Sequence, residues 1–160
     1  MWFGGGAKLV WIVDRSNRIR YKWQGRDMLR VFIADDSEVL RERLFELLSE
    51  LEGIEIVGQA KNGIEASNLI WALQPDVVIL DIRMEGGSGI EALKTIKKYE
   101  SAPIVMIFTN YPSHQYRQRC LEGGADFFFD KSTEFQELIE VFKQIMQDTI
   151  SVDKLKSQMK

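Results

Sequence analysis

Short apolar runs recur along this chain, and four of them end on or beside a polar residue. The runs are Val31–Ala34, Val77–Leu80, Ile104–Phe108 and Phe127–Phe129. Brief runs rich in valine, isoleucine and phenylalanine predict strands buried on both faces, as in a parallel sheet. Because the carboxyl ends of parallel strands share one edge, the polar residues that follow should converge there. These residues are Asp35 with Asp36, Asp81, Thr109, and Asp130 with Lys131.

Helical periodicity separates the runs, so that five strand and helix pairs can be counted. Ser37 is placed to cap a first helix whose leucines repeat every three to four residues up to Gly53. A second strand, Ile54–Gly58, leads through the turn signal Asn62-Gly63 into a second helix. This alternation predicts an α/β domain built on a parallel sheet.

The other helices differ in polarity. A third helix, from Gly89, should bury one apolar face. A polar fourth helix is expected near Ser113–Glu122, and a fifth from Glu134 to about Asp148 carries a strong apolar stripe. In the second helix, Trp71 is expected to serve packing and not function.

Composition fits one globular domain, with 160 residues, 45% hydrophobic and 28% charged. The net charge of -3 hides an asymmetry, because residues 1–27 carry +4 and residues 28–160 carry -7. An acidic body does not favour direct nucleic-acid binding by this chain. The expected organisation is an N-terminal extension over 1–27, a domain over 28–150 and a polar tail over 151–160.

The N-terminal extension lies outside the strand and helix rhythm and holds three of the four tryptophans. Three interpretations stay open: a cloning or start-site artefact ahead of a natural start at Met28, a short native arm that packs or binds something, and a membrane-surface segment. The longest apolar stretch there, Leu9–Val13, is too short for a membrane span or a signal-peptide core. The single cysteine, Cys120, cannot form an internal disulfide, which favours a reducing, cytoplasmic location.

The predicted cluster of oxygen ligands suits a hard cation. Asp35 and Asp36 are adjacent, and at a strand end, where the chain turns, both can face the edge. Like charges packed there either raise the pKa of a carboxylate or require a cation. A few carboxylates that leave several waters in place fit Mg²⁺ better than a full Ca²⁺ cage. The lone histidine, His114, lies in the polar helix region and is expected to be exposed or capping.

Asp81 follows the most apolar of the strands, where a charge is costly unless it has partners. With Mg²⁺ held by Asp36 and Asp81 and with Lys131 opposite, the charge on an incoming phosphoryl group is neutralised. In-line attack by a carboxylate oxygen then becomes feasible, and the Thr109 hydroxyl could donate to the phosphoryl oxygens. Each of these residues alone could be an ordinary helix cap, strand residue or surface charge. The prediction of a phosphoryl-transfer site therefore rests on their occurrence together at the strand ends.

With these motifs, the chain resembles the receiver domain of two-component response regulators over about Leu29 to Gln147. Val31–Asp36 is similar to the family's acid-pair strand, Ala60–Ala66 to the start of its second helix, and Val78–Met84 to its phosphoacceptor strand. Gly89 falls where the family has a glycine. The resemblance implies a flavodoxin-like, doubly wound α/β fold with five helices and a five-stranded parallel sheet of order 2-1-3-4-5.

The resemblance also implies the chemistry of the site. Asp81 would accept a phosphoryl group from a sensor histidine kinase or a histidine phosphotransfer protein. Mg²⁺ would be bound by Asp36 directly, by Asp35 mainly through water, by Asp81 and by the backbone carbonyl of Arg83. The side chains of Arg83 and Tyr111 flank the site and would tune the lifetime of the phosphoryl group.

Thr109 and Lys131 would hold the phosphoryl group, and Phe128 would be the switch aromatic that turns inward when Thr109 moves. Two residues depart from the family pattern. Glu85 stands where a proline often follows methionine, and Ser132 stands where a proline after a cis bond is frequent. The bond between Lys131 and Ser132 is therefore open as to cis or trans, and no catalytic group is lost.

The predicted function is a Mg²⁺-dependent phosphoacceptor of a two-component phosphorelay, not an enzyme, since it promotes only its own phosphorylation and dephosphorylation. It would signal through its fourth helix, fifth strand and fifth helix, by docking to an unknown downstream protein or output domain, or as a homodimer. About a dozen residues follow the fifth helix, so either a stand-alone receiver or one excised from a longer regulator is expected.

Three alternative functions make different demands on the sequence. An aspartyl-nucleophile phosphatase needs two aspartates separated by one residue and a cap, whereas Asp35 and Asp36 are adjacent. A flavin-binding protein of the same fold needs a phosphate loop rich in serine and threonine after the first strand, and Asp35–Glu38 is the opposite. A pseudo-receiver, acting as a phosphorylation-independent interaction module, stays open.

Overall fold

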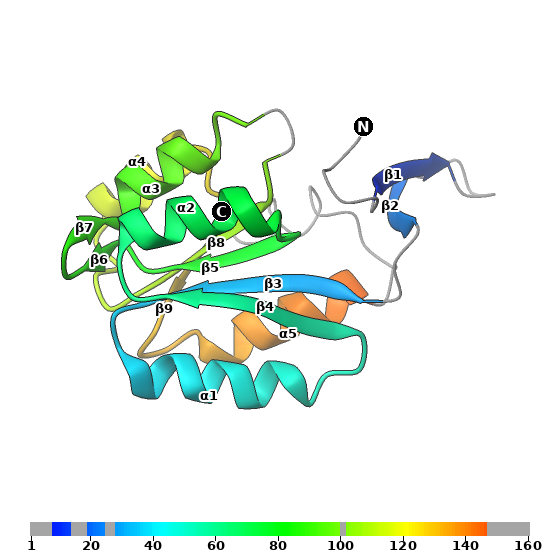
Figure 1. Ribbon diagram of the computed structural model, residues 1–160, viewed down its shortest axis with the longest axis horizontal. Helices are drawn as coiled ribbons and strands as arrows, with labels where there is room; N and C mark the ends of the chain where they lie inside the picture. The colour runs from blue at the N-terminus through cyan, green and yellow to red at the C-terminus, as the bar shows by residue number, and fades with distance from the viewer. Residues whose placement is uncertain (1–7, 14–18, 25–27, 100–101, 147–160) are drawn as a thin grey trace.

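The computed structural model describes residues 8–13, 19–24, 28–99 and 102–146 (Figure 1). One parallel sheet is formed by β3 (Leu29–Ala34), β4 (Ile54–Ala60), β5 (Val77–Leu80), β8 (Ile104–Thr109) and β9 (Phe127–Asp130). The spatial order is β4-β3-β5-β8-β9. Counted within this sheet, it is the predicted order 2-1-3-4-5, which confirms the doubly wound fold.

Five helices cover the sheet: α1 (Glu38–Ser49), α2 (Gly63–Leu73), α3 (Gly89–Ile96), α4 (His114–Glu122) and α5 (Phe135–Met146). Figure 1 shows α1 and α5 on one face and α2, α3 and α4 on the other. Each predicted helix is present, and the starts agree within one residue. The predicted end of the fifth helix, near Asp148, and the tail over 151–160 lie outside the described residues.

Both faces of the sheet bury a hydrophobic core. Because successive strand residues point to opposite faces, β3 contributes Val31 and Ile33 to the α1 and α5 side and Phe32 and Ala34 to the other. Cys120 of α4 lies fully buried in the core under α2, α3 and α4, and burial raises the pKa of its thiol to about 11. The thiol therefore stays protonated at neutral pH.

Side-chain caps start the helices next to the site. The Ser37 hydroxyl accepts a hydrogen bond from Leu40 N at 3.3 Å, which confirms the predicted cap of α1. Asn62 Oδ1 accepts from Glu65 N at 2.8 Å and caps α2. These caps satisfy amide groups that the first turn of a helix leaves without partners, and they fix where the chain turns away from the sheet edge.

Two antiparallel hairpins were not predicted. In the N-terminal extension, β1 (Lys8–Val13) pairs with β2 (Ile19–Gln24), although the sequence interpretation assigned no element there. Beyond β5, the glycine-rich loop contains the short strands β6 (Arg83–Met84) and β7 (Gly87–Ser88), joined through Gly86 at a φ of +78°. Two-residue strands carry too little periodicity to be read from sequence.

Trp71 does not pack in the core. Its side chain is 60% exposed, and its ring centroid lies 4.8 Å from that of Tyr99. The buried face of α2 carries Ala66 and Ile70, and Trp71 stands about 100° further round the helix. The expected packing role of Trp71 is therefore limited to this pair of aromatic rings at the surface.

Candidate functional site

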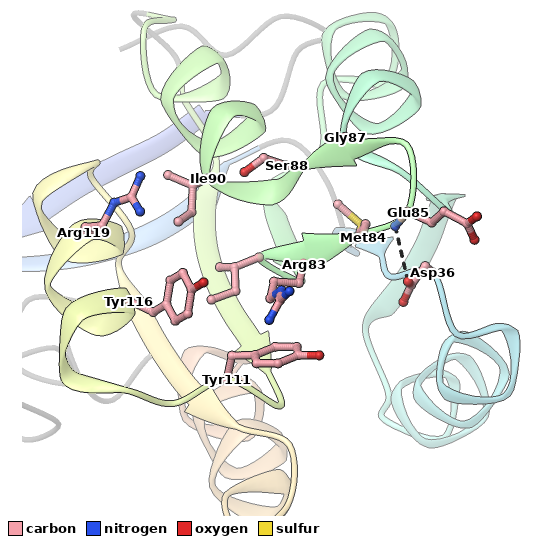
Figure 2. Close-up of a pocket in the computed structure, with 11 residues that line it drawn as sticks. Asp36, Arg83, Met84, Glu85, Gly87, Ser88, Ile90, Tyr111, Tyr116 and Arg119 are labelled. Carbon is pink, nitrogen blue, oxygen red and sulfur yellow. Dashed lines mark hydrogen bonds between the residues drawn. The ribbon is translucent and has the colours of Figure 1, made fainter.

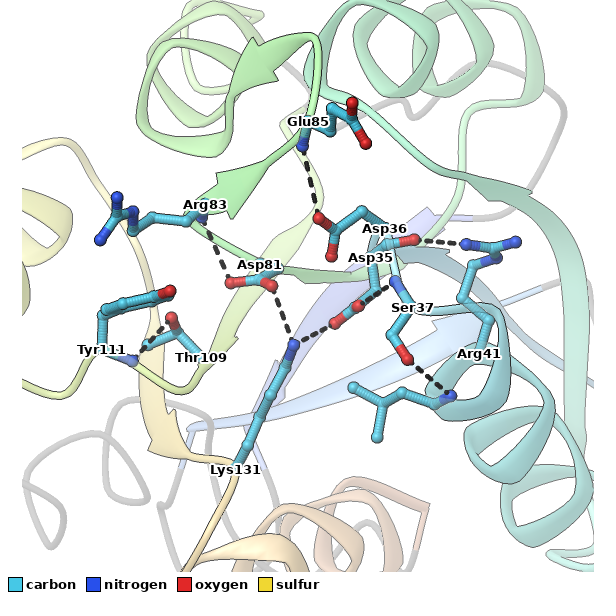
Figure 3. A network of polar contacts seen from close by, with 11 residues as sticks. Asp35, Asp36, Ser37, Arg41, Asp81, Arg83, Glu85, Thr109, Tyr111 and Lys131 are labelled. Atoms are coloured by element: carbon cyan, nitrogen blue, oxygen red, sulfur yellow. Dashed lines mark hydrogen bonds and ion pairs between the residues drawn. The ribbon is translucent and has the colours of Figure 1, made fainter.

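The predicted convergence of polar residues at one sheet edge is present in the structure (Figure 3). Carboxylate oxygens of Asp35, Asp36 and Asp81 all lie within 4.8 Å of one another. Lys131 Nζ lies 2.5 Å from Asp35 Oδ2 and 2.8 Å from Asp81 Oδ2. Thr109, the last residue of β8, is fully buried. The edge thus combines three carboxylates, an ammonium group and a hydroxyl.

Strand register explains why these residues meet. Ala34 of β3 pairs with Leu80 of β5, and Asp81 N donates to Ala34 O at 2.9 Å. Asp35 and Asp81, which come next along their strands, therefore leave the sheet at the same level. On the other side of β5, Lys131 N donates to Thr109 O at 2.9 Å, so the lysine starts from the same edge.

Lys131 is the electrostatic centre of the site. Its side chain is 9% exposed, and it faces the almost fully buried carboxylates of Asp35 and Asp81. Burial lowers the pKa of Lys131, but the hydrogen bonds and charges of these two aspartates outweigh burial and raise the pKa overall. The ammonium is thus held in its charged form between two acids.

Asp35 and Asp36 sit in different environments. Asp35 is 2% exposed, its Oδ1 accepts from Ser37 N at 2.8 Å, and its backbone carbonyl accepts from Arg41 Nη1 at 2.6 Å. Burial raises the pKa of Asp35, although Lys131 and the Ser37 amide act in the opposite direction. Asp36 is exposed, and its Oδ2 accepts a long hydrogen bond of 3.4 Å from Glu85 N. Asp36 is therefore the carboxylate most open to an incoming ion.

Gly89 allows α3 to begin directly against the end of β5. A Cβ added at Gly89 would lie 1.8 Å from the carbonyl oxygen of Asp81, which no side chain can tolerate. Gly89 N donates to Ile82 O at 3.1 Å and holds the two segments together. The glycine thus fixes the backbone that presents Asp81.

A cleft of about 560 Å³ opens beside Asp36, between the β6 and β7 hairpin and α4 (Figure 2). Arg83 and Tyr111, which were predicted to flank the site, both line it, and the Arg83 guanidinium carbon lies 4.2 Å from the Tyr111 ring centroid. Tyr116 and Arg119 of α4 line it as well. These two were not predicted, because they lie on a helix whose position depends on tertiary packing.

Phe128 of β9, the predicted switch aromatic, is buried, with 2% of its surface exposed. The Arg117 guanidinium carbon lies 4.6 Å from its ring centroid. No cis peptide bond occurs among the described residues, so the bond between Lys131 and Ser132 is trans.

The donor set fits a divalent cation. In the part of the chain that the structure describes, Asp35, Asp36 and Asp81 form the one cluster of three or more acidic, histidine or cysteine groups that could hold a metal. All donors are oxygens, and the three carboxylates exceed the single Lys131 charge. This excess and the hardness of the ligands suit Mg²⁺. Arg83 N donates to Asp81 Oδ1 at 3.3 Å, so Arg83, the predicted carbonyl ligand, adjoins the cluster.

The sequence also matches a known protein family. The family model of the response regulator receiver domain matches residues 31–143. The chain belongs to this family. An uncharacterized response regulatory protein of Yersinia pestis is 40% identical over 123 residues, which cover 77% of this chain and 50% of that protein.

Solved receiver structures agree with the fold. The response regulator domain of Thermotoga maritima CheB superposes with a TM-score of 0.66 at 31% identity and covers 76% of this chain and 96% of that one. A chain of the CheX-CheY-BeF3-Mg complex from Borrelia burgdorferi matches with a TM-score of 0.62 at 28% identity and covers 71% and 89%.

The chain spans about half the length of the curated relatives that it matches. Within the described residues, none of the helices has both the length and the apolar character needed to cross a membrane.

Proposed function

We propose that this receiver domain accepts a phosphoryl group on Asp81 from a sensor histidine kinase or a histidine phosphotransfer protein. The observation that carries the proposal is the Lys131 ammonium, which contacts Asp81 Oδ2 at 2.8 Å while two more carboxylates stand within 4.8 Å. An ordinary surface aspartate requires neither a buried ammonium group nor a cation site beside it. A carboxylate that attacks a phosphoryl group requires both, because negative charges must be neutralised as they approach.

The chemical step is an in-line displacement. One Asp81 carboxylate oxygen forms a bond to phosphorus, the bond from phosphorus to the donor histidine nitrogen breaks, and its electron pair stays on that imidazole. Lys131 neutralises negative charge beside Asp81, and the buried Thr109 hydroxyl donates to a phosphoryl oxygen. When bound by Asp35, Asp36, Asp81 and the Arg83 carbonyl, Mg²⁺ supplies further positive charge for the phosphoryl oxygens.

The readout of the phosphoryl group would use Thr109 and Phe128. A contact between Thr109 and the phosphoryl group shifts the end of β8, and the buried Phe128 side chain follows. The surface formed by α4, β9 and α5 then changes shape and binds a downstream protein, an output domain or a second copy of the chain. The domain promotes only its own phosphorylation and dephosphorylation, and we expect this in the cytoplasm, without direct nucleic-acid binding by this chain.

The test is intact-protein mass after incubation with acetyl phosphate, with and without Mg²⁺. We expect one phosphoryl adduct on the wild type in the presence of Mg²⁺ and none on Asp81→Asn. Asp36→Asn keeps the acceptor and should lower the yield by weakening Mg²⁺ binding. An adduct that survives Asp81→Asn would show that the acceptor is another residue. No adduct, together with no Mg²⁺ binding, would favour a pseudo-receiver that acts by docking.

A further inference from the structure

The turn that carries Lys131 is held by polar groups on both of its sides. Asp130 Oδ1 accepts from Ser132 N at 2.8 Å and from the Ser132 hydroxyl at 2.6 Å. The Asp130 carbonyl accepts from Glu134 N at 2.8 Å and from Thr133 N at 3.3 Å. Since the bond after Lys131 is trans and no proline restrains it, these hydrogen bonds define the turn.

Glu134 accepts a hydrogen bond from a backbone amide of β9 that pairs with no neighbouring strand. Lys131 N donates to Thr109 O, and amide groups of neighbouring strand residues point in opposite directions. Asp130 N therefore points away from β8, on the outer side of β9, the last strand of the sheet. Glu134 Oε2 accepts from this amide at 2.7 Å, a short charge-assisted hydrogen bond.

The same carboxylate faces α4. Glu134 Oε2 lies 3.8 Å from Arg117 Nη2, with both side chains about one third exposed. An ion pair at this distance and exposure contributes little. The hydrogen bond to Asp130 N is the stronger of the two contacts, because it is shorter and its donor is fixed in the backbone.

The position of Lys131 depends on this turn. Its ammonium must contact Asp35 at 2.5 Å and Asp81 at 2.8 Å at once, which leaves little tolerance for movement of the backbone beneath it. A lysine stem is flexible, so the place of its Cα decides whether Nζ is centred between the two acids.

We propose that Glu134 is a positioning residue for Lys131, acting through its hydrogen bond to Asp130 N rather than through its charge. The part of this inference that concerns phosphorylation rests on the proposed function. The part that concerns the placement of Lys131 does not.

Three variants separate these roles. Glu134→Ala removes the acceptor and the charge, whereas Glu134→Gln keeps an amide oxygen that can accept from Asp130 N and removes only the charge. Glu137→Ala is the matched control, an exposed glutamate in the first turn of α5, the helix that begins directly after Glu134. Thermal denaturation of each variant shows whether the fold is retained.

The first readout is the initial rate of phosphorylation by acetyl phosphate, beside Mg²⁺ affinity from calorimetry. Glu134→Ala should slow phosphorylation about tenfold, as expected for loss of one charge-assisted hydrogen bond. Glu134→Gln keeps a neutral and therefore weaker hydrogen bond and should slow phosphorylation by no more than about threefold, whereas Glu137→Ala should stay within about twofold of the wild type. Mg²⁺ affinity should not fall in any of the three, because the acidic ligands are not touched and a displaced Lys131 ammonium would repel the cation less. A purely structural defect would lower both quantities together.

The second readout needs no phosphorylation. Lys131 is labelled by reductive methylation, and peptide mass spectrometry measures the rate. Centred between two acids and 9% exposed, Lys131 should react slowly in the wild type, Glu134→Gln and Glu137→Ala, and several-fold faster in Glu134→Ala.

The inference is overturned if Glu134→Ala matches the wild type, or if Glu134→Gln behaves like Glu134→Ala, which would make the charge the operative feature. If the wild type itself takes up no phosphoryl group, the proposed function fails, and the labelling rates alone decide the role of Glu134.

Discussion

At the sheet edge, two buried carboxylates share one lysine ammonium group. Asp35 and Asp81 are 2% and 4% exposed, and a buried carboxylate needs a positively charged partner. Among the described residues, Lys131 is the one cation within hydrogen-bond distance of either carboxylate. One ammonium shared by two buried carboxylates leaves negative charge in excess. This excess prepares the edge for a cation, and Asp36, exposed beside it, gives the cation a way in.

Gly89 offers a direct test of how the Asp81 backbone is held. Gly89→Ala should destabilise the protein by about 2 to 3 kcal/mol, because its Cβ would overlap the Asp81 carbonyl oxygen. Gly87→Ala is the control, since its Cβ would meet nothing closer than 3.4 Å. Urea denaturation measures both. Equal stabilities for the two variants would contradict the assigned role of Gly89.

The pH dependence of stability tests the turn after β9. Hydrogen bonds from the Ser132 hydroxyl and amide lower the pKa of Asp130 below its ordinary value. A pKa that is lower in the folded state gives stability above the unfolded pKa, and this stability is lost as pH falls through the folded pKa. Ser132→Ala should therefore be less stable than the wild type at pH 7, by a small amount because solvent screens Asp130. In urea titrations from pH 7 to pH 2 the difference should shrink, and a constant difference would mean that packing causes it.

Among the secondary-structure elements, α5 buries one apolar face against the sheet. Its apolar stripe includes Leu138, Phe142 and Ile145, all buried against β3, β8 and β9 in one core. Phe142→Ala should lower the free energy of unfolding by about 3 to 5 kcal/mol, since it leaves a cavity in a close-packed site. Trp71→Ala, on exposed α2 surface, should cost under about 2 kcal/mol. Urea denaturation compares them, and similar losses would contradict the assigned cores.

The elements were predictable where local pattern decides them. Ser37 caps α1 as predicted, and the apolar runs predicted the sheet and the meeting of Asp35, Asp81 and Lys131 at one edge. The hairpin of β6 and β7 and the surface position of Trp71 were missed. Two-residue strands have no measurable period, and the side on which an aromatic ring lies depends on the exact rotation of its helix.

Contacts between distant elements were the other gap. No spacing in the sequence places Arg117 of α4 over Phe128 of β9. This contact follows from how α4 packs on the sheet, which propensity and periodicity do not encode.

In the whole molecule, the polar side chains of the site lie at one edge of the parallel sheet, and both faces of the sheet are buried under helices. The residues before that edge are buried and apolar, so the site rests on rigid strands and not on mobile loops. The matched segment covers 55% and 50% of two curated relatives, so both extend well beyond the receiver domain. If Asp81 is phosphorylated as proposed, we expect the surface formed by α4, β9 and α5 to transmit the change to a partner.

We expect the Asp81 carboxylate to become an acyl phosphate. Sodium borohydride reduces an aspartyl phosphate to homoserine, with loss of phosphate, and leaves a free carboxylate intact. After incubation with acetyl phosphate and Mg²⁺, reduction and peptide mass spectrometry should find homoserine at position 81 and at no other aspartate. Homoserine at position 35 or 36, or at none despite bound Mg²⁺, would contradict the account.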